Sequence, residues 1–376
     1  MDYLLSEKQL RRRDEFRAFA QSEIIPGGKG FARENIRRAA RRGYLGLPLP
    51  REQGGLGEDF TTYILLIEEL SRVCASTGVI LAVHTSVGSL SLLYHGTESQ
   101  KRRYLPGLTR GSLLGAFALT EAGAGSDAAA LQMTAERTGE EGYCLNGVKL
   151  FITSGGEADL YTIFARTGPE KGSRGITAFL VEKGTPGLEV GPPERKMGLH
   201  GSVTTELRLS DVRLPAENRL GGEGEGFAIA MSLLDGGRIG IAAQGLGLAG
   251  AALDETAARL FPKGERRGAR IGQGDAFALA DLYTGLEAAR LLVYRAARLK
   301  ESGAPCSKEA SMAKMFATDL AVRATTRCLD LWGPEGMRAE NPLSRYFCDA
   351  KVTQIYEGSN QIQRLVIARE LLKEKR

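Results

Sequence analysis

Near its end the chain reads Gln354-Ile355-Tyr356-Glu357-Gly358-Ser359-Asn360-Gln361-Ile362-Gln363-Arg364-Leu365. This segment places one carboxylate, Glu357, beside a glycine and directly before an apolar pattern with helical spacing. Gly358 has no side chain to keep a ligand away from the backbone, and Ser359 or Asn360 can cap the helix that follows. A glutamate in such a turn is usually a solvated surface residue, so the residue types alone assign no function.

The whole chain has the composition of an ordinary soluble globular protein. Its 376 residues are 43% hydrophobic and 25% charged, which is enough for two or three packed units. The net charge of +5 is spread over short arginine runs with acidic residues between them. Solvated helix faces explain this pattern better than a nucleic-acid-binding stripe does, and we expect no nucleic acid partner.

The cysteines and the apolar runs indicate a reducing compartment and no integral membrane segment. Five cysteines lie at positions 74, 144, 306, 328 and 348, without a Cys-x-x-Cys pair, and with the three histidines they show no metal-ligand spacing. No signal-peptide pattern opens the chain, and the apolar run 78–94 is shorter than the ~20 residues of a membrane span. We therefore expect free thiols, no bound metal and a cytoplasmic protein.

The hydrophobic pattern changes twice along the chain and predicts three domains. Residues 1–112 are expected to be helical, with helices from a capping box at Ser6 to Pro26 and over 33–42, 61–74 and 78–94. Residues 113–222 contain short β-rich runs separated by turns, which favours an antiparallel sheet or barrel. Within them, Asn146-Gly147 predicts a hairpin. Helical periodicity returns over 223–376.

Two segments of the β-rich region have the character of a ligand site. One reads Phe117-Ala118-Leu119-Thr120-Glu121-Ala122-Gly123-Ala124-Gly125-Ser126-Asp127, a strand followed by a glycine-rich loop whose backbone N–H groups can meet a phosphate or a ring oxygen. The other, Phe151-Ile152-Thr153-Ser154, places an aromatic side chain and a hydroxyl two residues apart. Either segment alone also fits an ordinary turn or a buried strand.

A third segment, Leu234-Asp235-Gly236-Gly237-Arg238, belongs to an expected helix. Asp235 and Arg238 are three residues apart, so they share a helix face and can pair with each other. A loop stands before the last β-rich run, at Lys196-Met197-Gly198-Leu199-His200-Gly201-Ser202.

Taken together, these segments resemble those of the acyl-CoA dehydrogenases, and the resemblance spans nearly the whole chain. Glu357 matches the catalytic glutamate of the family's Tyr-Glu-Gly-Thr-x-Gln-Ile-Gln-Arg segment, with Ser359 in place of Thr. Some members carry the glutamate on the helix of the third segment, where this chain has Gly237. The resemblance implies an α+β multidomain fold with an N-terminal helical domain, a middle antiparallel β domain and a C-terminal four-helix bundle.

The resemblance also implies site residues, each at the position that matches a family motif. It places FAD at Phe117, Leu119, Thr120, Gly125, Ser126, Phe151, Ile152, Thr153, Gly333, Ser359 and Gln361. It places the acyl-CoA substrate at Ser126, Asp235, Arg238, Glu357 and Gly358.

The implied activity is the α,β-dehydrogenation of an acyl-CoA to the trans-2-enoyl-CoA, in a homotetramer that passes electrons to electron-transferring flavoprotein. Val83-His84-Thr85-Ser86 resembles short-chain members. Two alternatives remain open. One is an acyl-CoA oxidase that uses oxygen, and the other is a non-catalytic acyl-CoA-binding homologue.

Two segments depart from the family pattern. Asp330-Leu331-Trp332-Gly333-Pro334-Glu335-Gly336 replaces a Gln-x-x-Gly-Gly-x-Gly segment, and an aspartate there can only accept hydrogen bonds near the expected pyrophosphate. The family's Arg-x-x-Phe-Gly is not recognisable within 261–274. We therefore expect weaker FAD binding, with Arg266, Arg267 or Arg270 as a partial substitute.

Overall fold

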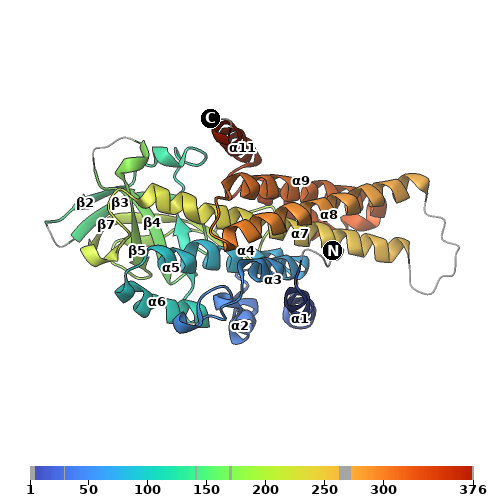
Figure 1. The fold of residues 1–376 in the computed structure, drawn as a ribbon, viewed down its shortest axis with the longest axis horizontal. Helices are drawn as coiled ribbons and strands as arrows, with labels where there is room; N and C mark the ends of the chain where they lie inside the picture. The colour runs from blue at the N-terminus through green and yellow to red at the C-terminus, as the bar shows by residue number, and fades with distance from the viewer. Residues whose placement is uncertain (1–4, 29, 140–141, 169–171, 262–271, 375–376) are drawn as a thin grey trace.

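The computed structural model describes residues 5–28, 30–139, 142–168, 172–261 and 272–374. Along the chain, a group of helices is followed by a β-sheet and then by a long helical bundle (Figure 1). This order confirms the predicted fold class. The sheet lies at one end of the elongated molecule, and the long helices of the bundle extend to the other.

The helices before the sheet match the predicted ranges within a few residues, except that no separate range was predicted for α6. They are α1 (Glu7–Glu23), α2 (Arg33–Arg41), α3 (Phe60–Val73), α4 (Ala75–Val83), α5 (Leu90–His95) and α6 (Glu98–Arg110). The expected capping box is present, because Ser6 Oγ accepts from Gln9 N and Gln9 Oε1 accepts from Ser6 N. The helix expected over 78–94 begins at Ala75 and contains a π-helical segment, His84–Ser89, between α4 and α5.

Eight described strands form one sheet. They are β1 (Gly115–Ala118), β2 (Thr134–Arg137), β3 (Gly142–Thr153), β4 (Leu160–Arg166), β5 (Ile176–Glu182), β6 (Leu188–Val190), β7 (Thr204–Pro215) and β8 (Arg219–Leu220). Their order is β6-β7-β3-β2-β4-β5-β8, and β1 pairs with β4. Most neighbours are antiparallel as predicted, but β1 and β2 run parallel to β4. The start of β1 is held there because Gly115 N donates to His84 Nδ1 and Leu114 N to Asp159 Oδ2.

The predicted hairpin at Asn146-Gly147 is wrong. Both residues lie inside the continuous strand β3, which pairs with β2 on one side and β7 on the other. The pairing of β3 with β7 shifts here, and the extra residue on β7 is Asp211, with φ 51°. Asn146 Oδ1 accepts from Asp211 N at 2.8 Å, so the amide that would favour a turn instead stabilises a β-bulge.

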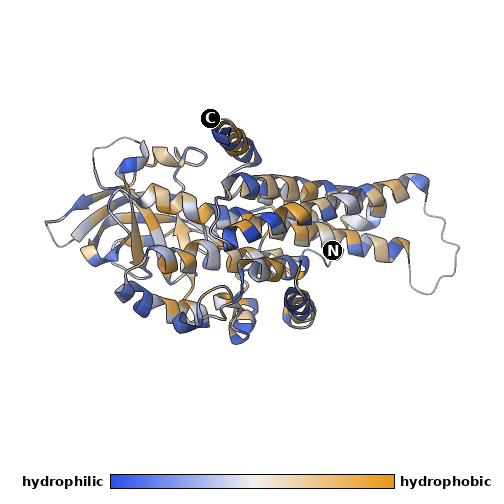
Figure 2. Cartoon of the chain, in the orientation of Figure 1, coloured by the Kyte–Doolittle hydropathy of each residue, from blue (hydrophilic) through white to orange (hydrophobic). Residues whose placement is uncertain are grey.

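The bundle is built around one long helix. Its members are α7 (Gly226–Leu260), α8 (Gln273–Glu301), α9 (Ser307–Trp332), α10 (Pro342–Thr353) and α11 (Asn360–Glu374). Helix α7 packs between α3 and α9, and a Cβ at Gly247 would lie only 2.4 Å from Glu68 O of α3. The helices before and after the sheet therefore share one hydrophobic core, and the sheet has a second. Figure 2 shows polar residues concentrated on the outer helices α1, α2 and α6.

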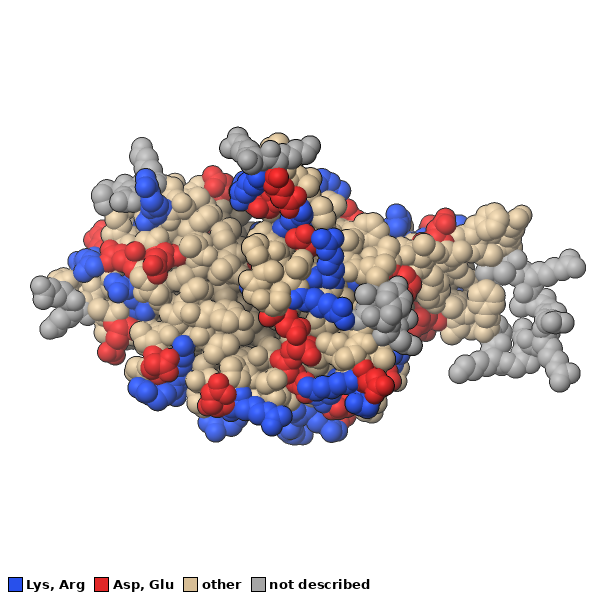
Figure 3. Space-filling view, in the orientation of Figure 1, with Lys and Arg blue, Asp and Glu red and all other residues tan. Residues whose placement is uncertain are grey.

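Two helical stretches of the described chain, Ala75–His95 and Gly226–Leu260, are long and apolar enough to cross a membrane by length and composition. Their most apolar windows are 94% and 67% buried inside the protein, so packing in the helical core accounts for their apolar character. On the face drawn in Figure 3, basic and acidic side chains are interspersed.

Candidate active site

The loop between α10 and α11 holds the predicted base in an uncommon backbone conformation. Glu357 has φ 54° and Gly358 has φ 87°, so two consecutive residues are left-handed. This region suits glycine, but it costs a glutamate about 1 kcal/mol or more, which the surrounding contacts must offset. Gln363 supplies two of these contacts, since its Nε2 donates to the carbonyl oxygens of Glu357 at 3.1 Å and of Gly358 at 2.9 Å.

The carboxylate of Glu357 lies directly against the backbone of α7. A Cβ at Gly237 would lie 2.5 Å from Glu357 Oε2 and 2.9 Å from its carboxyl carbon, closer than real Cβ atoms approach. Any side chain at position 237 would therefore displace the carboxylate. Gly237 stands where the resemblance implies that some members carry their glutamate, and the structure adds that this glycine makes room for Glu357.

Burial gives this carboxyl group the acidity of a base that works near neutral pH. Glu357 Oε2 is buried and has no hydrogen-bond partner among the described residues. Burial raises the pKa of Glu357 to about 7, against the opposing effects of the positive charges on Arg238 and Lys314. Such an unpartnered, partly protonated carboxyl group is costly to bury, which makes it a candidate for chemistry rather than for stability.

Arg238 and Asp235 form the ion pair that their spacing predicted. Arg238 Nη1 donates to Asp235 Oδ1 at 2.8 Å, and Ser307 Oγ of α9 donates to Asp235 Oδ2 at 2.5 Å. Arg238 is buried, and its Nε has no partner among the described residues. The pair therefore fixes the guanidinium and leaves one of its donors available next to the base.

The structure brings together the two segments of the β region that have ligand-site character. Leu150 N of β3 donates to Thr120 O at 2.9 Å, which places the loop after β1 beside the end of β3. Phe151 stands in a bulge of β3 with φ 57°, and 62% of its side chain is exposed. The N–H groups of the exposed residues Gly125 and Ser126 donate to no other described residue. These free donors and the exposed aromatic ring fit the phosphate and ring oxygens of a flavin nucleotide.

Other predicted residues lie in different settings. Leu119 and Ile152 are buried, and Ile152 packs in the core of the sheet, so only its backbone is available to a ligand. Ser359 caps α11, with Oγ accepting from Ile362 N at 3.5 Å, and Gln361 is exposed. Phe117, Thr120 and Thr153 are half-buried, so part of each side chain remains accessible.

Gly333 is far from the base within the same chain. It ends α9, whose last residue, Trp332, is 18 residues beyond Lys314; that is about 27 Å of helix at 1.5 Å per residue. Lys314 itself contacts the base loop, since its Nζ donates to Gly358 O. A ligand that contacts both Gly333 and Glu357 would have to span this distance or be shared between two copies of the chain.

The segment 330–336 is anchored to α7 in the structure. Trp332 Nε1 donates to Thr256 Oγ1 at 3.2 Å, and the guanidinium of Arg259 stacks on the Trp332 ring. Asp330 is 3.6 Å from Arg327 in an ion pair. The other departing segment, with Arg266, Arg267 and Arg270, lies outside the described residues apart from its ends.

Two buried lysines next to these segments escaped the sequence analysis. Lys149 of β3 donates to Leu119 O and to Glu121 Oε1, and so ties β3 to the glycine-rich loop. Lys314 contacts the base loop from α9 and is 0% exposed. The sequence does contain a signal for Lys314, because this lysine interrupts the stripe of alanines that α9 buries. A lysine is almost never fully buried without a partner, so its place in that stripe indicates a specific contact.

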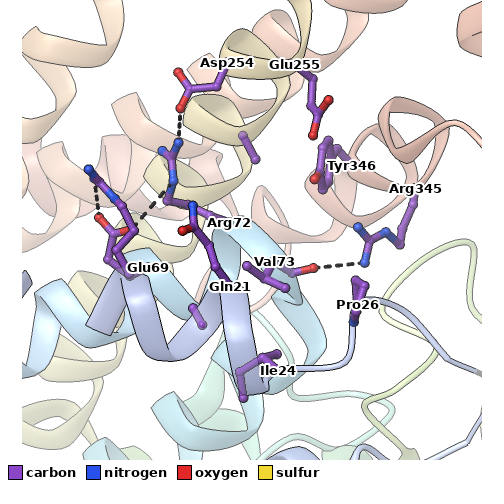
Figure 4. Close-up of a pocket in the computed structure, with 13 residues that line it drawn as sticks. Gln21, Ile24, Pro26, Glu69, Arg72, Val73, Asp254, Glu255, Arg345 and Tyr346 are labelled. Carbon is purple, nitrogen blue, oxygen red and sulfur yellow. Dashed lines mark hydrogen bonds and ion pairs between the residues drawn. The ribbon is translucent and has the colours of Figure 1, made fainter. Parts of the chain in front are cut away.

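A separate pocket of about 330 Å³ lies between α1, α3, α7 and α10 (Figure 4). Several of its charged groups have partners, since Arg72 contacts both Glu69 and Asp254, and Arg345 Nη1 donates to Val73 O. Asp254 is 17 residues beyond Gly237 on α7, or about 26 Å along the helix. This pocket is therefore remote from the base.

Comparisons with known proteins match nearly the whole chain. Family models described as the N-terminal, middle and C-terminal domains of acyl-CoA dehydrogenase match residues 6–112, 116–212 and 224–372. An acyl-CoA dehydrogenase of Bacillus subtilis is 49% identical over 98% of this chain and 99% of its own length. The butyryl-CoA dehydrogenase structure from Megasphaera elsdenii is 41% identical, with a TM-score of 0.92 over 99% of this chain and 100% of that chain. A chain in a structure described as the electron transferring flavoprotein of Acidaminococcus fermentans is 44% identical, with a TM-score of 0.92 over 99% of this chain and 100% of that chain.

Proposed function

The chain belongs to the acyl-CoA dehydrogenase family, and from that premise we propose that it oxidises a short-chain acyl-CoA to the trans-2-enoyl-CoA with Glu357 as the base. The observation that carries the proposal is the carboxyl group held against Gly237, whose Oε2 is buried and has no hydrogen-bond partner among the described residues. Its pKa of about 7 leaves a large fraction ionised at neutral pH, and the ionised form can take a proton.

The step breaks two C–H bonds of the substrate and forms one C=C bond. Glu357 takes the proton from the α-carbon of the thioester, and the β-hydrogen leaves with its electron pair. When bound, FAD supplies the two-electron oxidant that accepts this hydride. The backbone N–H of Glu357 donates to no other described residue, so it is available to stabilise negative charge on the thioester oxygen. One such donor typically contributes ~10²–10³ in rate.

The residues of the β region fit a flavin as described above. Gly125 and Ser126 would donate to its phosphate or ring oxygens, and Phe151 and Thr153 would lie beside the ring system. Lys149 orders this site through Leu119 and Glu121. On the substrate side, Asp235 and Arg238 would line the acyl-CoA channel together with Ser126 and Gly358.

The packing around α7 limits the space for the acyl chain. Gly240 lies one turn from Gly237, and a Cβ there would contact Ala82 Cβ at 3.5 Å and Tyr63 Oη at 3.9 Å. Helices α3, α4 and α7 therefore approach one another closely at Gly240, which lies about 4.5 Å along α7 from Gly237. The sequence analysis inferred short-chain preference from 83–86, but His84 is not in the site. Its Nε2 bonds Leu108 O, and its Nδ1 accepts from Gly115 N.

We expect butyryl-CoA to have at least a ~10-fold higher kcat/KM than dodecanoyl-CoA, because the gap beside Gly240 has room for little more than a methyl group and a long chain has to separate the helices there. A panel of straight and short branched acyl-CoA substrates with a dye acceptor measures this. A higher kcat/KM for dodecanoyl-CoA would show that the pocket extends past Gly240.

The loss of activity on the acid side of the pH profile reflects the protonation of Glu357. The carboxyl group must be ionised to act, and burial raises its pKa to about 7. We therefore expect kcat/KM for butyryl-CoA to fall as the pH drops through about 7, by roughly tenfold per unit below it. The profile is measured from pH 5 to pH 9 with flavin content followed in parallel. A rate that stays level down to pH 5 would contradict a buried carboxylate as the base.

We further propose that the electrons leave for an electron-transferring flavoprotein, and that the protein works as a homotetramer in the cytoplasm. The five cysteines are all free, as expected of a reducing compartment. The FAD-loaded protein should convert butyryl-CoA to trans-2-butenoyl-CoA when supplied with such an acceptor. Rapid peroxide formation in air without any acceptor protein would favour an oxidase instead, and failure to bind FAD would favour a non-catalytic homologue.

A further inference from the structure

A fully buried lysine lies behind the loop that carries the base. Lys314 of α9 is 0% exposed. Its Nζ donates to Gly358 O at 2.8 Å and to Asn360 Oδ1 at 2.9 Å. No other described residue accepts a hydrogen bond from this ammonium group, so both of its contacts go to the loop and to the first residue of α11.

Placing an ammonium group there is costly. Burial lowers the pKa of Lys314 to about 7, and Glu357 and Asp319 act in the opposite direction. A neutral side chain of similar shape, such as methionine, would avoid this cost in a helix whose neighbouring buried positions are alanines and small hydroxyl residues. The stability of α9 therefore does not explain the lysine.

The contacts of Lys314 fix the conformation on which the geometry of the base depends. Gly358 O accepts from Lys314 Nζ and Gln363 Nε2, while Glu357 O accepts from Gln363 Nε2 alone. Asn360 is in turn held by Thr318 and Asp319, one turn further along α9. The peptide unit that follows Gly358 is thereby clamped to α9, while the one between Glu357 and Gly358 is held by Gln363 of α11.

The charged and titratable groups around the carboxylate come from several elements. Arg238 approaches from α7, Lys314 from α9 and Tyr63 from α3, while Tyr356 precedes Glu357 in the loop. Arg238 is already paired with Asp235 at 2.8 Å. Lys314 has no such ion pair among the described residues, so its charge acts on Glu357 without a bound counter-ion.

We propose that Lys314 is a positioning residue for the base: its ammonium group clamps the Gly358 carbonyl, which holds Glu357 against Gly237, and its positive charge favours the ionised carboxylate. This inference rests on the proposed role of Glu357. It assigns Lys314 no contact with the reacting atoms.

The test uses Lys314→Met, which removes the charge and both hydrogen bonds, in the FAD-loaded protein. We expect kcat to fall by at least ~10-fold with KM changed less than ~3-fold, since the clamp acts on the base and not on substrate binding. Losing the positive charge raises the pKa of Glu357, so the acid limb of the pH profile should move up by about one unit. Lys308→Met is the matched control, because Lys308 lies on the same helix but pairs only with Glu309 and Glu374 near the surface.

Two further variants keep the proposal falsifiable if Lys314→Met fails to fold. Lys314→Arg retains the charge and Lys314→Gln removes it, so only the glutamine variant should move the acid limb. In a double-mutant cycle, adding Lys314→Met to Glu357→Gln should lower kcat by less than a further ~2-fold, because the clamp acts through the base and Glu357→Gln has already removed that base.

The role of Lys314 would be overturned if every variant that removes its charge kept the acid limb of the wild-type pH profile. It would also be overturned if the losses in kcat of the two single variants multiplied in the double mutant. Full activity of Glu357→Gln alone would instead refute the proposed function. The two failures are therefore distinguishable.

Discussion

Glu357→Gln is expected to lower kcat for butyryl-CoA by ~10³-fold while FAD stays bound, because the amide keeps the shape of the side chain but cannot take a proton. The carboxylate has no hydrogen-bond partner at Oε2 among the described residues, so the exchange removes no contact that supports the fold. Its thermal stability should therefore stay at or slightly above the wild-type value, since a neutral amide is less costly to bury than a carboxylate.

Anaerobic bleaching of the bound flavin by butyryl-CoA measures this effect in a single turnover. Glu370→Gln is the control, because Glu370 lies on α11 and interacts with Lys373 near the surface. It should bleach at the wild-type rate. If Glu357→Gln bleaches within a few-fold of the wild-type rate, another group is the base.

The second large effect is expected at Gly237. In Gly237→Ala the new methyl group would lie 2.5 Å from Glu357 Oε2, and the flexible carboxylate must swing away to make room. We expect a loss of ~10² or more in kcat, which is the general contribution of a well-placed base. The fold should be retained, since alanine in a helix interior is favoured over glycine by about 0.5–1 kcal/mol.

The neighbouring glycine provides a matched control on the same helix. A Cβ at Gly236 would meet Phe60 Cζ at 3.7 Å and Lys300 Cε at 3.8 Å, which are ordinary van der Waals contacts. Gly236→Ala should therefore be as stable as Gly237→Ala and should keep most of its activity. Equal activity of the two variants would show that the carboxylate does not need the space at position 237.

The elements with strong local signals were predicted from the sequence, and those set by distant contacts were not. The capping box at Ser6 and the helices over 33–42 and 61–74 follow from short-range patterns, and the structure contains them. Asn146-Gly147 has an equally strong local signal, but the contact between Asn146 and Asp211 turns it into a bulge. The bond of Asp211 spans 65 residues of sequence, so no local pattern reports it.

The candidate site shows the same division. Glu357 and the loop around Gly125 stand in contiguous motifs and could be identified from the residues that surround them. The left-handed conformation of Glu357 and the clamp by Lys314 depend on a contact across 44 residues, which only the folded chain brings together. The alanines of α9 around Lys314 are buried, so the sequence pattern there predicts core packing and gives no separate signal for the role of the lysine.

The central claim is that Glu357 removes the α-proton, and hydrogen exchange at the α-carbon tests it most directly. The FAD-loaded protein is incubated in D₂O with an acyl-CoA analogue that has α-hydrogens but no oxidisable β-hydrogen, and deuterium uptake is followed by mass spectrometry. Wild-type protein should exchange the α-hydrogen rapidly above pH 7, and Glu357→Gln should exchange it at least ~10²-fold more slowly. Exchange at the wild-type rate in Glu357→Gln would contradict the account.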